Sequence, residues 1–598
     1  MNAMARLRRM LPITQWLPEY GRDTLANDLV AALIVTVLLI PQSLAYAMLA
    51  GLPAQIGLYA SIMPLLVYAI FGTSRTLSVG PVAVISLMTA TIAGQVAGQG
   101  GADYQSAVLV LASMSGIILV LMGIVRLGLL ANFLSHPVIS GFVTASALII
   151  VLSQLKHLLG IETSGHTLLT LAEGLFSHWQ ATHWPTLLLG LGTLVFLLVA
   201  RRWLKPGLIM LGLAPRAADL LAKAAPILAV AVTIGLTWGL KLDQQGVSVV
   251  GTIPASLPPL TMPSLDIGLW RELFVGALLI SMVGFVESVS VGQTLAAKRR
   301  QRIDPDQELI GLGGSNLAAA MTGGMPVTGG FSRSVVNFDA GAETPAAGAF
   351  TAMGIALASL TLTPLIAYLP LATLAATIIV AVVSLIDLRA IAQTWAYSRS
   401  DFAAMMATIL VTLVYGVESG ILAGVGLSLV IHLYRTSRPH VALIGRVPDS
   451  EHFRNVDRHR VETDDQLTIL RVDESLYFAN SRYLEDIVLG LVASQPELRH
   501  LVLACQAVNL IDTSALDSLE AINTRLEGAG VQLHLSEVKG PVMDRLRKTD
   551  FLDHLSGDVF LSTFDAWRAL HGARASALSS PDPSKHDPGT ARHFSDSS

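Results

Sequence analysis

The chain has 598 residues, of which 52% are hydrophobic and only 14% are charged, and its formal net charge is −4. A mean hydropathy of +0.59 is too high for an ordinary soluble protein, so the composition indicates a membrane protein. It gives no indication of nucleic-acid binding. The only cysteine, Cys505, cannot form an internal disulfide, and no histidine or cysteine cluster has the spacing of metal ligands. We therefore expect no metal and no cofactor.

The N-terminal residues 1–26 are basic but lack the short apolar core and cleavage site of a signal peptide. We expect them to remain as a cytoplasmic segment. At about 20 apolar residues per span, with shorter broken spans allowed, the following apolar runs predict fourteen transmembrane helices. They are 27–49, 54–72, 81–97, 105–126, 135–157, 184–201 and 224–240, then 270–295, 307–322, 332–341, 346–367, 370–386, 402–416 and 418–435. Seven spans in each half would give the second half inverted topology.

Basic residues in the loops give the orientation, because Lys and Arg accumulate on the cytoplasmic side. They occur before the first helix and after the fourth, sixth, eighth and twelfth helices. The residues are Arg6, Arg8, Arg9, Arg126, Arg201, Arg202, Lys205, Lys298, Arg299, Arg300, Arg302, Arg389 and Arg399. The opposite loops carry few or none, so both termini are predicted to be cytoplasmic.

Two stretches predict half-helices that begin at membrane depth. In 72–90, GTSRTLSVGPVAVISLMTA, the pair Gly80-Pro81 precedes an apolar run, and Pro81 suits a first helical position. In 322–334, TGGMPVTGGFSRS, glycines precede Ser332, which is predicted to be an N-cap. The free N–H groups and the positive dipole end at such starts favour an anion. The two starts could face each other near the midplane, as in transporters with broken helices.

Two charged residues lie in these apolar regions. Arg333 in a first helical turn opposes the dipole, so a negative group is expected to offset it. Alternatively Arg333 pairs with a carboxylate such as Glu287, or reaches an interface, and serves only structure. Glu287 is the only charge in 278–296. A carboxylate at that depth is costly unless protonated or paired, which favours a functional role over a purely structural hydrogen bond.

Beyond Arg435 the chain becomes polar and its apolar runs shorten. We predict a transport region at 27–436, a linker at 437–464, a small α/β domain at 465–573 and a disordered tail at 574–598. In the small domain the predicted strands are 467–472, 475–480, 498–508 and 531–538, and the predicted helices are 481–494 and 514–526.

Several co-linear motifs resemble those of the SulP family of sulfate-permease-type anion transporters. They are IPQSLAYAMLAGLPAQIGLYAS (40–61), GTSR (72–75), SVGPVAVISL (78–87), GFVES (284–288), ELIGLGGSN (308–316) and GGFSRSVVNFDAGAETP (329–345). The resemblance extends from about residue 17 to residue 570. Ile56, where the family usually has tyrosine, is a mild departure.

The resemblance implies an α-helical membrane protein whose fourteen helices form a 7+7 inverted repeat. Helices 1–4 and 8–11 would form a core that slides past a gate, helices 5–7 and 12–14, in an elevator-type alternating-access mechanism. It also implies a homodimer, a location in the cell inner membrane, and a C-terminal cytoplasmic STAS domain similar to bacterial anti-sigma-factor antagonists. Such a domain could bind a cytoplasmic protein partner.

The resemblance also carries over site residues by position. The substrate-binding set is Gln42, Tyr46, Pro81, Val82, Ala83, Phe331, Ser332, Arg333 and Ser334. Alternatively, Gln42 only satisfies carbonyls freed at Pro41, Tyr46 only packs, and Ser332 is only a cap.

The resemblance also implies roles for two further residues, Glu287 and Ser514. Sodium-coupled relatives are expected to have an aspartate where this chain has Glu287, so proton coupling is the preferred interpretation. In the STAS-like region, Ser514 lies where the bacterial antagonists are phosphorylated. Alternatively Asp512, Thr513 or Ser514 only caps the helix that follows.

The predicted function is therefore proton-coupled symport of a small anion: sulfate, bicarbonate or a C4-dicarboxylate. The alternatives are a sodium-coupled bicarbonate carrier, a nucleobase carrier, and an anion-sensing membrane protein that signals through the STAS-like domain. An enzyme is not expected, because Cys505 stands alone and the C-terminal histidines lack ligand spacing.

Overall fold

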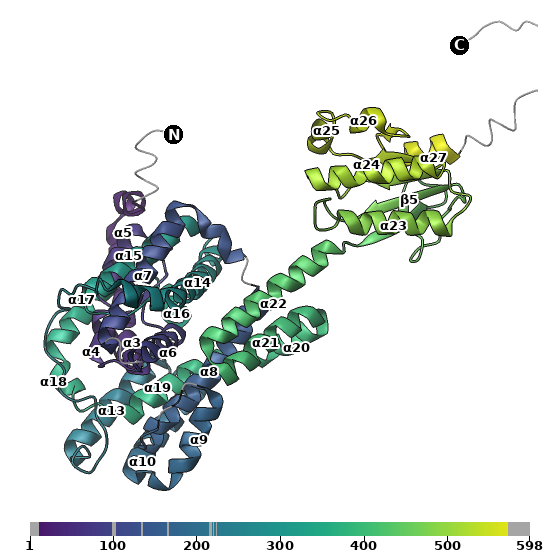
Figure 1. Ribbon diagram of the computed structural model, residues 1–598. Coiled ribbons are helices and arrows are strands. Elements are labelled where there is room, and N and C mark those ends of the chain that lie inside the picture. Colours follow the sequence, from purple (N-terminus) through teal and green to yellow (C-terminus); the bar gives the residue numbers. More distant parts are fainter. Residues whose placement is uncertain are drawn as a thin grey trace, which may run out of the picture. The chain divides into compact units, whose positions relative to one another are not determined.

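The computed structural model describes residues 11–98, 103–132, 135–163, 165, 167–214, 218, 221–222 and 224–571. The chain divides into two compact units, Met1–Ser428 and Leu429–Ser598. The first unit is helical, and the second contains a mixed β-sheet (Figure 1). The predicted disordered tail, 574–598, lies outside the described residues.

The elements of the first half of the helical unit follow in chain order. They are α2 (Ile13–Trp16), η1 (Leu17–Glu19), α3 (Arg22–Leu49), α4 (Gln55–Tyr59), α5 (Met63–Phe71), β1 (Val79–Gly80), α6 (Ala83–Gly98), α7 (Tyr104–Ile124), η2 (Leu127–Asn132), α8 (His136–Leu159), α9 (Leu168–His178), η3 (Trp179–Ala181), α10 (Trp184–Val199), η4 (Ala200–Leu204), α11 (Lys205–Met210) and α13 (Ala225–Leu240).

The second half contains a comparable series. Its elements are α14 (Ile267–Lys298), α15 (Pro305–Met321), β2 (Thr328–Gly329), α16 (Phe331–Asp339), α17 (Ala346–Thr361), α18 (Thr363–Ile366), α19 (Leu371–Val383), α20 (Leu388–Tyr397), α21 (Arg399–Tyr415) and α22 (Val417–Ser437).

Each of the fourteen predicted ranges contains a helix, although 54–72 is split into α4 and α5, and 346–367 into α17 and α18. Within the described residues, seven helices are long and apolar enough to cross a membrane, and several shorter apolar helices accompany them. This confirms a helical membrane protein. The count of fourteen spans and the inversion of the second half stay predictions.

Small residues allow α15 to pack closely against α7. A Cβ added at Gly116 would lie 2.9 Å from the carbonyl oxygen of Gly313, and one added at Gly313 would lie 2.8 Å from that of Gly116. In a lipid bilayer the hydrophobic effect does not drive helices together, so membrane helices commonly associate through close packing at small residues. The pair forms part of the main core, which draws buried residues from both halves of the unit.

A two-stranded ribbon joins the halves next to the predicted site. β1 pairs with β2 in antiparallel fashion, with Val79 opposite Gly329 and Gly80 opposite Thr328. Because α6 begins just after β1 and α16 just after β2, the ribbon brings the starts of both half-helices to one place. Pro81 was predicted at the first helical position. It lies two residues before α6. The first hydrogen bond of this helix runs from Ser86 N to the carbonyl of Val82, so the helix begins at Ala83 and not at Pro81.

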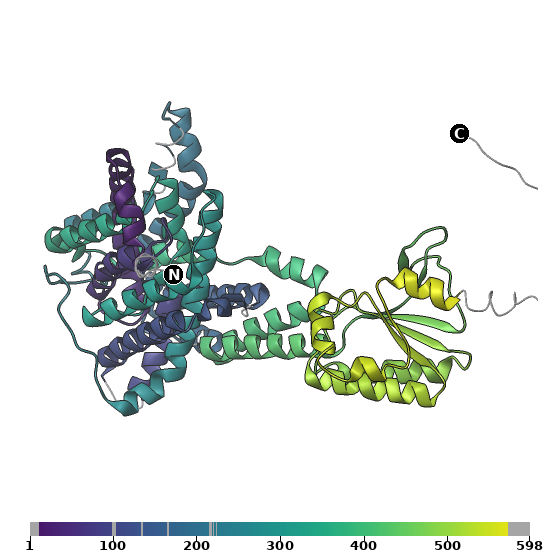
Figure 2. The same cartoon turned by 90° about the horizontal axis from the view of Figure 1, so that it is seen from above.

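The C-terminal unit is an α/β domain with sheet order β4-β3-β5-β6-β7-β8. Its elements are β3 (Val441–Arg446), β4 (Phe453–Asn455), β5 (Leu467–Val472), α23 (Ser481–Ser494), β6 (His500–Ala504), α24 (Thr513–Gly528), β7 (Gln532–Ser536), α25 (Gly540–Leu546), α26 (Phe551–His554), β8 (Val559–Phe560) and α27 (Thr563–His571). The strands from β5 to β8 are parallel, and β3 is antiparallel to both neighbours. The helices α23 and α24 cover one face of the sheet and α27 covers the other (Figure 2).

Two predictions for this unit need correction. The predicted strand 475–480 is wrong: Leu476 forms a single bridge to Ile511, and the chain then turns because Asn480 Oδ1 accepts a hydrogen bond from Tyr477 N at 3.0 Å. The predicted linker, 437–464, contains β3 and β4, so it contributes two strands to the sheet.

Candidate functional site

The start of α16 is fixed to the chain that leads into α6. Ser334 Oγ accepts a hydrogen bond from Ser78 N at 2.9 Å, and Gly330 N donates to the carbonyl of Ser78 at 3.2 Å. One turn further along α16, Asn337 Nδ2 donates to the carbonyl of Thr76 at 3.0 Å. These contacts satisfy backbone groups that could not find water in a membrane interior. They hold the two half-helices in one arrangement.

Arg333 lies between the two helix starts and is only 3% exposed. Its Nη2 donates to the carbonyl of Pro81, whereas its buried Nη1 has no hydrogen-bond partner among the described residues. Glycines make room for this side chain. A Cβ at Gly80 would lie 2.4 Å from Arg333 Nη1, and one at Gly330 would lie 2.6 Å from Arg333 Nε. A buried cation with an unused donor is costly unless an anion is present.

The prediction that Ser332 caps this helix is wrong. α16 begins one residue earlier, with Gly330 as its N-cap, and no side chain accepts from its first N–H groups. Glycine is preferred here because a side chain would collide with Arg333. The first-turn N–H groups of α16 therefore remain available to a ligand.

Two ionisable side chains, Tyr46 and Glu287, interact electrostatically with Arg333. Tyr46, from α3, is buried, which is also consistent with the packing alternative, and Glu287, from α14, is half-buried. Among the described residues, no salt bridge joins Glu287 to Arg333. The structure therefore does not support the alternative in which Arg333 and Glu287 form a structural ion pair.

A cavity of about 340 Å³ lies beside the start of α16. Gln42 from α3 and Ser332 from α16 both line it, so the structure brings these two predicted residues to one cavity. Further lining residues come from α10, η4, α11, α13 and α19. The full lining is Leu38, Pro41, Gln42, Leu197, Arg201, Lys205, Ala222, Ala225, Pro226, Ser332, Val336, Thr377, Val380, Ala381 and Ser384.

The other predicted residues do not line this cavity. Pro81, Val82 and Ala83 are buried at the entry to α6, and Ser334 is buried in its contact with Ser78. Phe331 is 51% exposed. The site thus has a buried part, around Arg333, and an open part, around Ser332.

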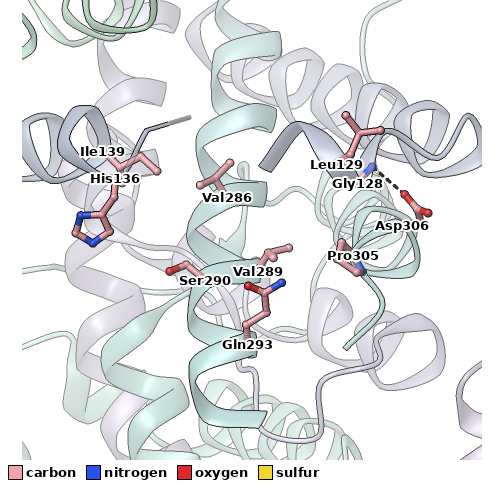
Figure 3. Close-up of a pocket in the computed structure, with 10 residues that line it drawn as sticks. All are labelled: Gly128, Leu129, His136, Ile139, Val286, Val289, Ser290, Gln293, Pro305 and Asp306. Atoms are coloured by element: carbon pink, nitrogen blue, oxygen red, sulfur yellow. Dashed lines mark hydrogen bonds between the residues drawn. The ribbon is translucent and has the colours of Figure 1, made fainter. Parts of the chain in front are cut away.

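A second cavity, of about 350 Å³, lies between α8, α14, α15 and η2 (Figure 3). His136 projects from one side, Ser290 and Gln293 from α14, and the carboxylate of Asp306 accepts from Gly128 N at 2.8 Å. Glu287 does not line it. This cavity therefore does not include the predicted coupling residue.

Ser514 lies in the first turn of α24 in the C-terminal unit. The cap of that helix is Asp512, whose Oδ1 accepts from Ala515 N at 2.9 Å. Ser514 is exposed. Of the three capping alternatives the structure selects Asp512, so the Ser514 hydroxyl is not needed to cap the helix.

Sequence reasoning missed Ser78 and Asn337 as residues that position the site, and it treated Arg201 and Lys205 only as loop charges. Ser78 lies in a quoted motif, but its partner Ser334 is far away in sequence. Nothing local could have indicated that Arg201 and Lys205 line the same cavity as Gln42.

Comparisons with known proteins identify the family. The model of the family described as "Sulfate permease family" matches residues 25–408, and that of the STAS domain matches residues 458–566. "Sulfate transporter 4.1, chloroplastic" of Arabidopsis thaliana is 34% identical over 88% of this chain and 77% of its own length. "Probable sulfate transporter MT1781" of Mycobacterium tuberculosis is 32% identical over 91% of this chain and 95% of its own length.

Solved structures agree on the fold. The murine solute carrier 26 family member A9 anion transporter, in its inward-facing state, matches with a TM-score of 0.85 and 23% identity over 96% of this chain and 95% of that one. The transmembrane domain of a cyanobacterium bicarbonate transporter, BicA, matches with a TM-score of 0.58 and 23% identity over 68% of this chain and 99% of that one. The chain belongs to the sulfate permease family, a family of membrane transporters rather than enzymes, and carries a C-terminal STAS domain.

Proposed function

We propose that this protein is a secondary active transporter of a small anion, which binds where the N-termini of α6 and α16 meet. The observation that carries the proposal is Arg333, whose buried Nη1 has no partner among the described residues. An oxyanion there would accept a charge-assisted hydrogen bond from the guanidinium and further ones from the uncapped first turn of α16. The binding set would comprise Gln42, Tyr46, Pro81, Val82, Ala83, Phe331, Ser332, Arg333 and Ser334.

Sulfate is the first candidate substrate, because the curated relatives are named as sulfate transporters. Bicarbonate and C4-dicarboxylates offer the same acceptor chemistry and remain candidates. The test is uptake of radiolabelled sulfate by the purified protein in proteoliposomes, with competition by a panel of unlabelled anions. Saturable uptake that other oxyanions inhibit supports the proposal. Absence of sulfate uptake, and of uptake of each competing anion when it is labelled in turn, refutes it.

Proton coupling is proposed to run through Glu287. The electrostatic interaction of Glu287 with Arg333 couples anion binding to proton binding. An anion that offsets the charge of Arg333 makes proton binding at Glu287 more favourable. By reciprocity, a proton on Glu287 makes anion binding more favourable. Sodium coupling is the alternative. A sodium-dependent uptake that does not respond to a pH step would favour it.

The cavity beside α16 supports an elevator-type movement. Its lining residues come from both groups of helices that the family resemblance assigns to core and gate: α3 and α16 belong to the core, and α10, α13 and α19 to the gate. Sliding at this border would expose the anion to alternate sides. The same resemblance underlies the proposed homodimer and the proposed location in the inner membrane, and the loop charges underlie the proposed cytoplasmic position of both termini.

The STAS domain is proposed to regulate transport through a cytoplasmic protein partner. Ser514 is exposed at the start of α24 and is not the cap, so a phosphate there would meet the positive end of the helix dipole. A sensor that signals through this domain without transport is the alternative. Measurable flux in proteoliposomes separates the two.

A further inference from the structure

The turn at the end of α16, residues 338–344, is held on one side by Arg299, the C-cap residue of α14. Arg299 donates from Nη2 to the carbonyl of Phe338 at 3.1 Å and from Nη1 to the carbonyl of Ala342. Its guanidinium also lies over the Phe338 ring, 4.4 Å from the ring centroid. Arg299 therefore fixes both the last turn of α16 and the backbone just beyond it.

The same turn is held on another side by Asp28 from α3, which is fully buried. Asp28 Oδ1 accepts from Glu343 N at 2.8 Å and from Thr344 N at 3.2 Å, and its Oδ2 accepts from Thr344 Oγ1 at 2.5 Å. The Glu343 side chain in turn accepts from Asn27 Nδ2 at 2.7 Å. Arg299 and Asp28 also attract each other electrostatically. A cation from one helix and a carboxylate from another thus hold one short turn.

This turn joins three helices that carry residues of the proposed anion site. Gln42 and Tyr46 lie on α3, Glu287 lies on α14, and Arg333 lies on α16. Because α16 has nine residues, it is about 13 Å long. Arg299 bonds to its last turn, whereas Arg333 belongs to its first. Any effect of Arg299 on the anion is therefore exerted through the orientation of α16.

The polar contacts near the start of α16 leave this orientation incompletely fixed. The hydrogen bonds of Gly330, Ser334 and Asn337 all reach one segment of the chain, residues 76–78. A helix attached along one edge is still free to rotate about that edge. In a helix of this length, a rotation of about 5° moves one end relative to the other by about 1 Å. A displacement of about 1 Å in a binding group is enough to weaken its function about a hundredfold.

We infer that Arg299 is a positioning residue for anion binding: it holds the end of α16 against α14, so that Arg333 and the free N–H groups of the first turn keep the orientation that the anion requires. The inference rests on the proposed function. The side chain suits this role in two ways. A cation is favoured at a helix C-terminus by the helix dipole, and the planar guanidinium presents donors that serve two carbonyls at once.

The experiment compares wild type with Arg299→Gln and Arg299→Lys in proteoliposomes. Initial rates of labelled sulfate uptake are measured against sulfate concentration, well below the melting temperature of each variant, and are normalised to the amount of folded protein. We expect the KM of Arg299→Gln to rise about tenfold, with a maximal rate within about twofold of wild type. Lysine keeps the charge and part of the hydrogen bonding, so the KM of Arg299→Lys should rise only about threefold.

The matched control is Lys298→Gln, which removes the same charge from the preceding residue. Lys298 Nζ lies 5.7 Å from the centroid of the Phe338 ring, and among the described residues it donates no hydrogen bond to α16. The KM of this variant should equal that of wild type. The comparison separates the hydrogen bonds of Arg299 from a general effect of positive charge at the end of α14.

A role confined to stability would lower the melting temperature or the yield of Arg299→Gln and leave the KM of its folded fraction unchanged, which would overturn the inference. An equal rise of KM in Lys298→Gln would also overturn it. If Arg299→Gln gives no folded protein, Arg299→Lys decides: a raised KM supports the inference, and a wild-type KM contradicts it. Wild-type protein that neither binds nor transports any anion would refute the proposed function itself, whereas a transporting wild type with an unaffected KM in Arg299→Gln would refute only the positioning role.

Discussion

Arg333 on α16 donates a hydrogen bond to the carbonyl of Pro81, which lies 252 residues earlier in the chain. This contact joins the start of one half-helix to the start of the other, and it uses only part of the guanidinium. The remaining Nη1 is buried without a partner among the described residues. A cation in the first turn of a helix opposes the dipole. The presence of Arg333 in this turn is explained if the guanidinium binds an anion that the N-terminus of α16 also attracts.

Replacing Gly330 with alanine is expected to lower anion affinity about tenfold by displacing Arg333. The new Cβ would lie 2.6 Å from Arg333 Nε and 3.0 Å from Val82 Cγ1. The backbone φ of Gly330 is −90°, so alanine meets no conformational penalty and the effect is steric. Equilibrium sulfate binding to the purified protein measures it. Gly192→Ala in α10 is the control, because nothing lies within 4 Å of the added Cβ. Equal affinities in the two variants would contradict the prediction.

Glu308→Gln is expected to destabilise the membrane unit by about 2 to 3 kcal/mol. The Glu308 carboxylate accepts from Tyr68 Oη at 2.8 Å, Thr73 N at 2.7 Å and Ser74 N at 3.0 Å, and an amide nitrogen would oppose some of these donors. Thermal unfolding in detergent measures the loss. Glu287→Gln is the comparison, since no hydrogen bond to the Glu287 carboxylate occurs among the described residues, and its melting temperature should stay near that of wild type. A larger drop for Glu287→Gln than for Glu308→Gln would reverse the assigned roles.

Glu287→Gln is expected to uncouple transport. The glutamine resembles a permanently protonated carboxyl group, so the variant should bind and exchange sulfate but should not accumulate it when an inward proton gradient is imposed. Uptake with and without a pH step, together with counterflow, measures both activities. Accumulation by the variant in response to the pH step would show that Glu287 does not carry the proton.

Cys505 should be unreactive in the folded protein at pH 8. It is only 2% exposed, and burial, with a smaller contribution from the nearby Glu537, raises the pKa of its thiol to about 12. The neutral, inaccessible thiol reacts poorly with a maleimide. Because the chain has no other cysteine, the labelling rate reports opening of the C-terminal unit. Rapid labelling of the native protein would mean that β6 and its neighbours are not packed as described.

Most of the helices could be predicted from sequence because their ranges are long and predominantly apolar. The β1–β2 ribbon could not. Each strand is two residues long and lies in a glycine-rich stretch, and its partner is in the other half of the chain. The strand assigned to 475–480 failed because the short apolar run at 476–479 fits a strand locally, whereas the side chain of Asn480 turns the chain.

The candidate site was predictable in its residue types and less so in its geometry. The glycines before Ser332, and Arg333 itself, are recognisable in the sequence, but serine is the better cap in isolation, which is why the sequence predicts Ser332 as the cap. Only the packed structure shows that Arg333 needs the space above Gly330. Arg201 was visible as a loop charge, and its place in the same cavity as Gln42 depends on how α10 and α19 pack beside α3.

The most direct test of anion binding at the paired half-helices is equilibrium binding of labelled sulfate to purified wild type and to Arg333→Ala. The variant loses a charge-assisted hydrogen bond, so we expect its affinity to fall about 10- to 100-fold while its melting temperature changes little. Arg202→Gln should bind as wild type does. Unchanged sulfate affinity in Arg333→Ala, accompanied by a fall of many degrees in its melting temperature, would show that this arginine holds the fold together and that the anion binds elsewhere.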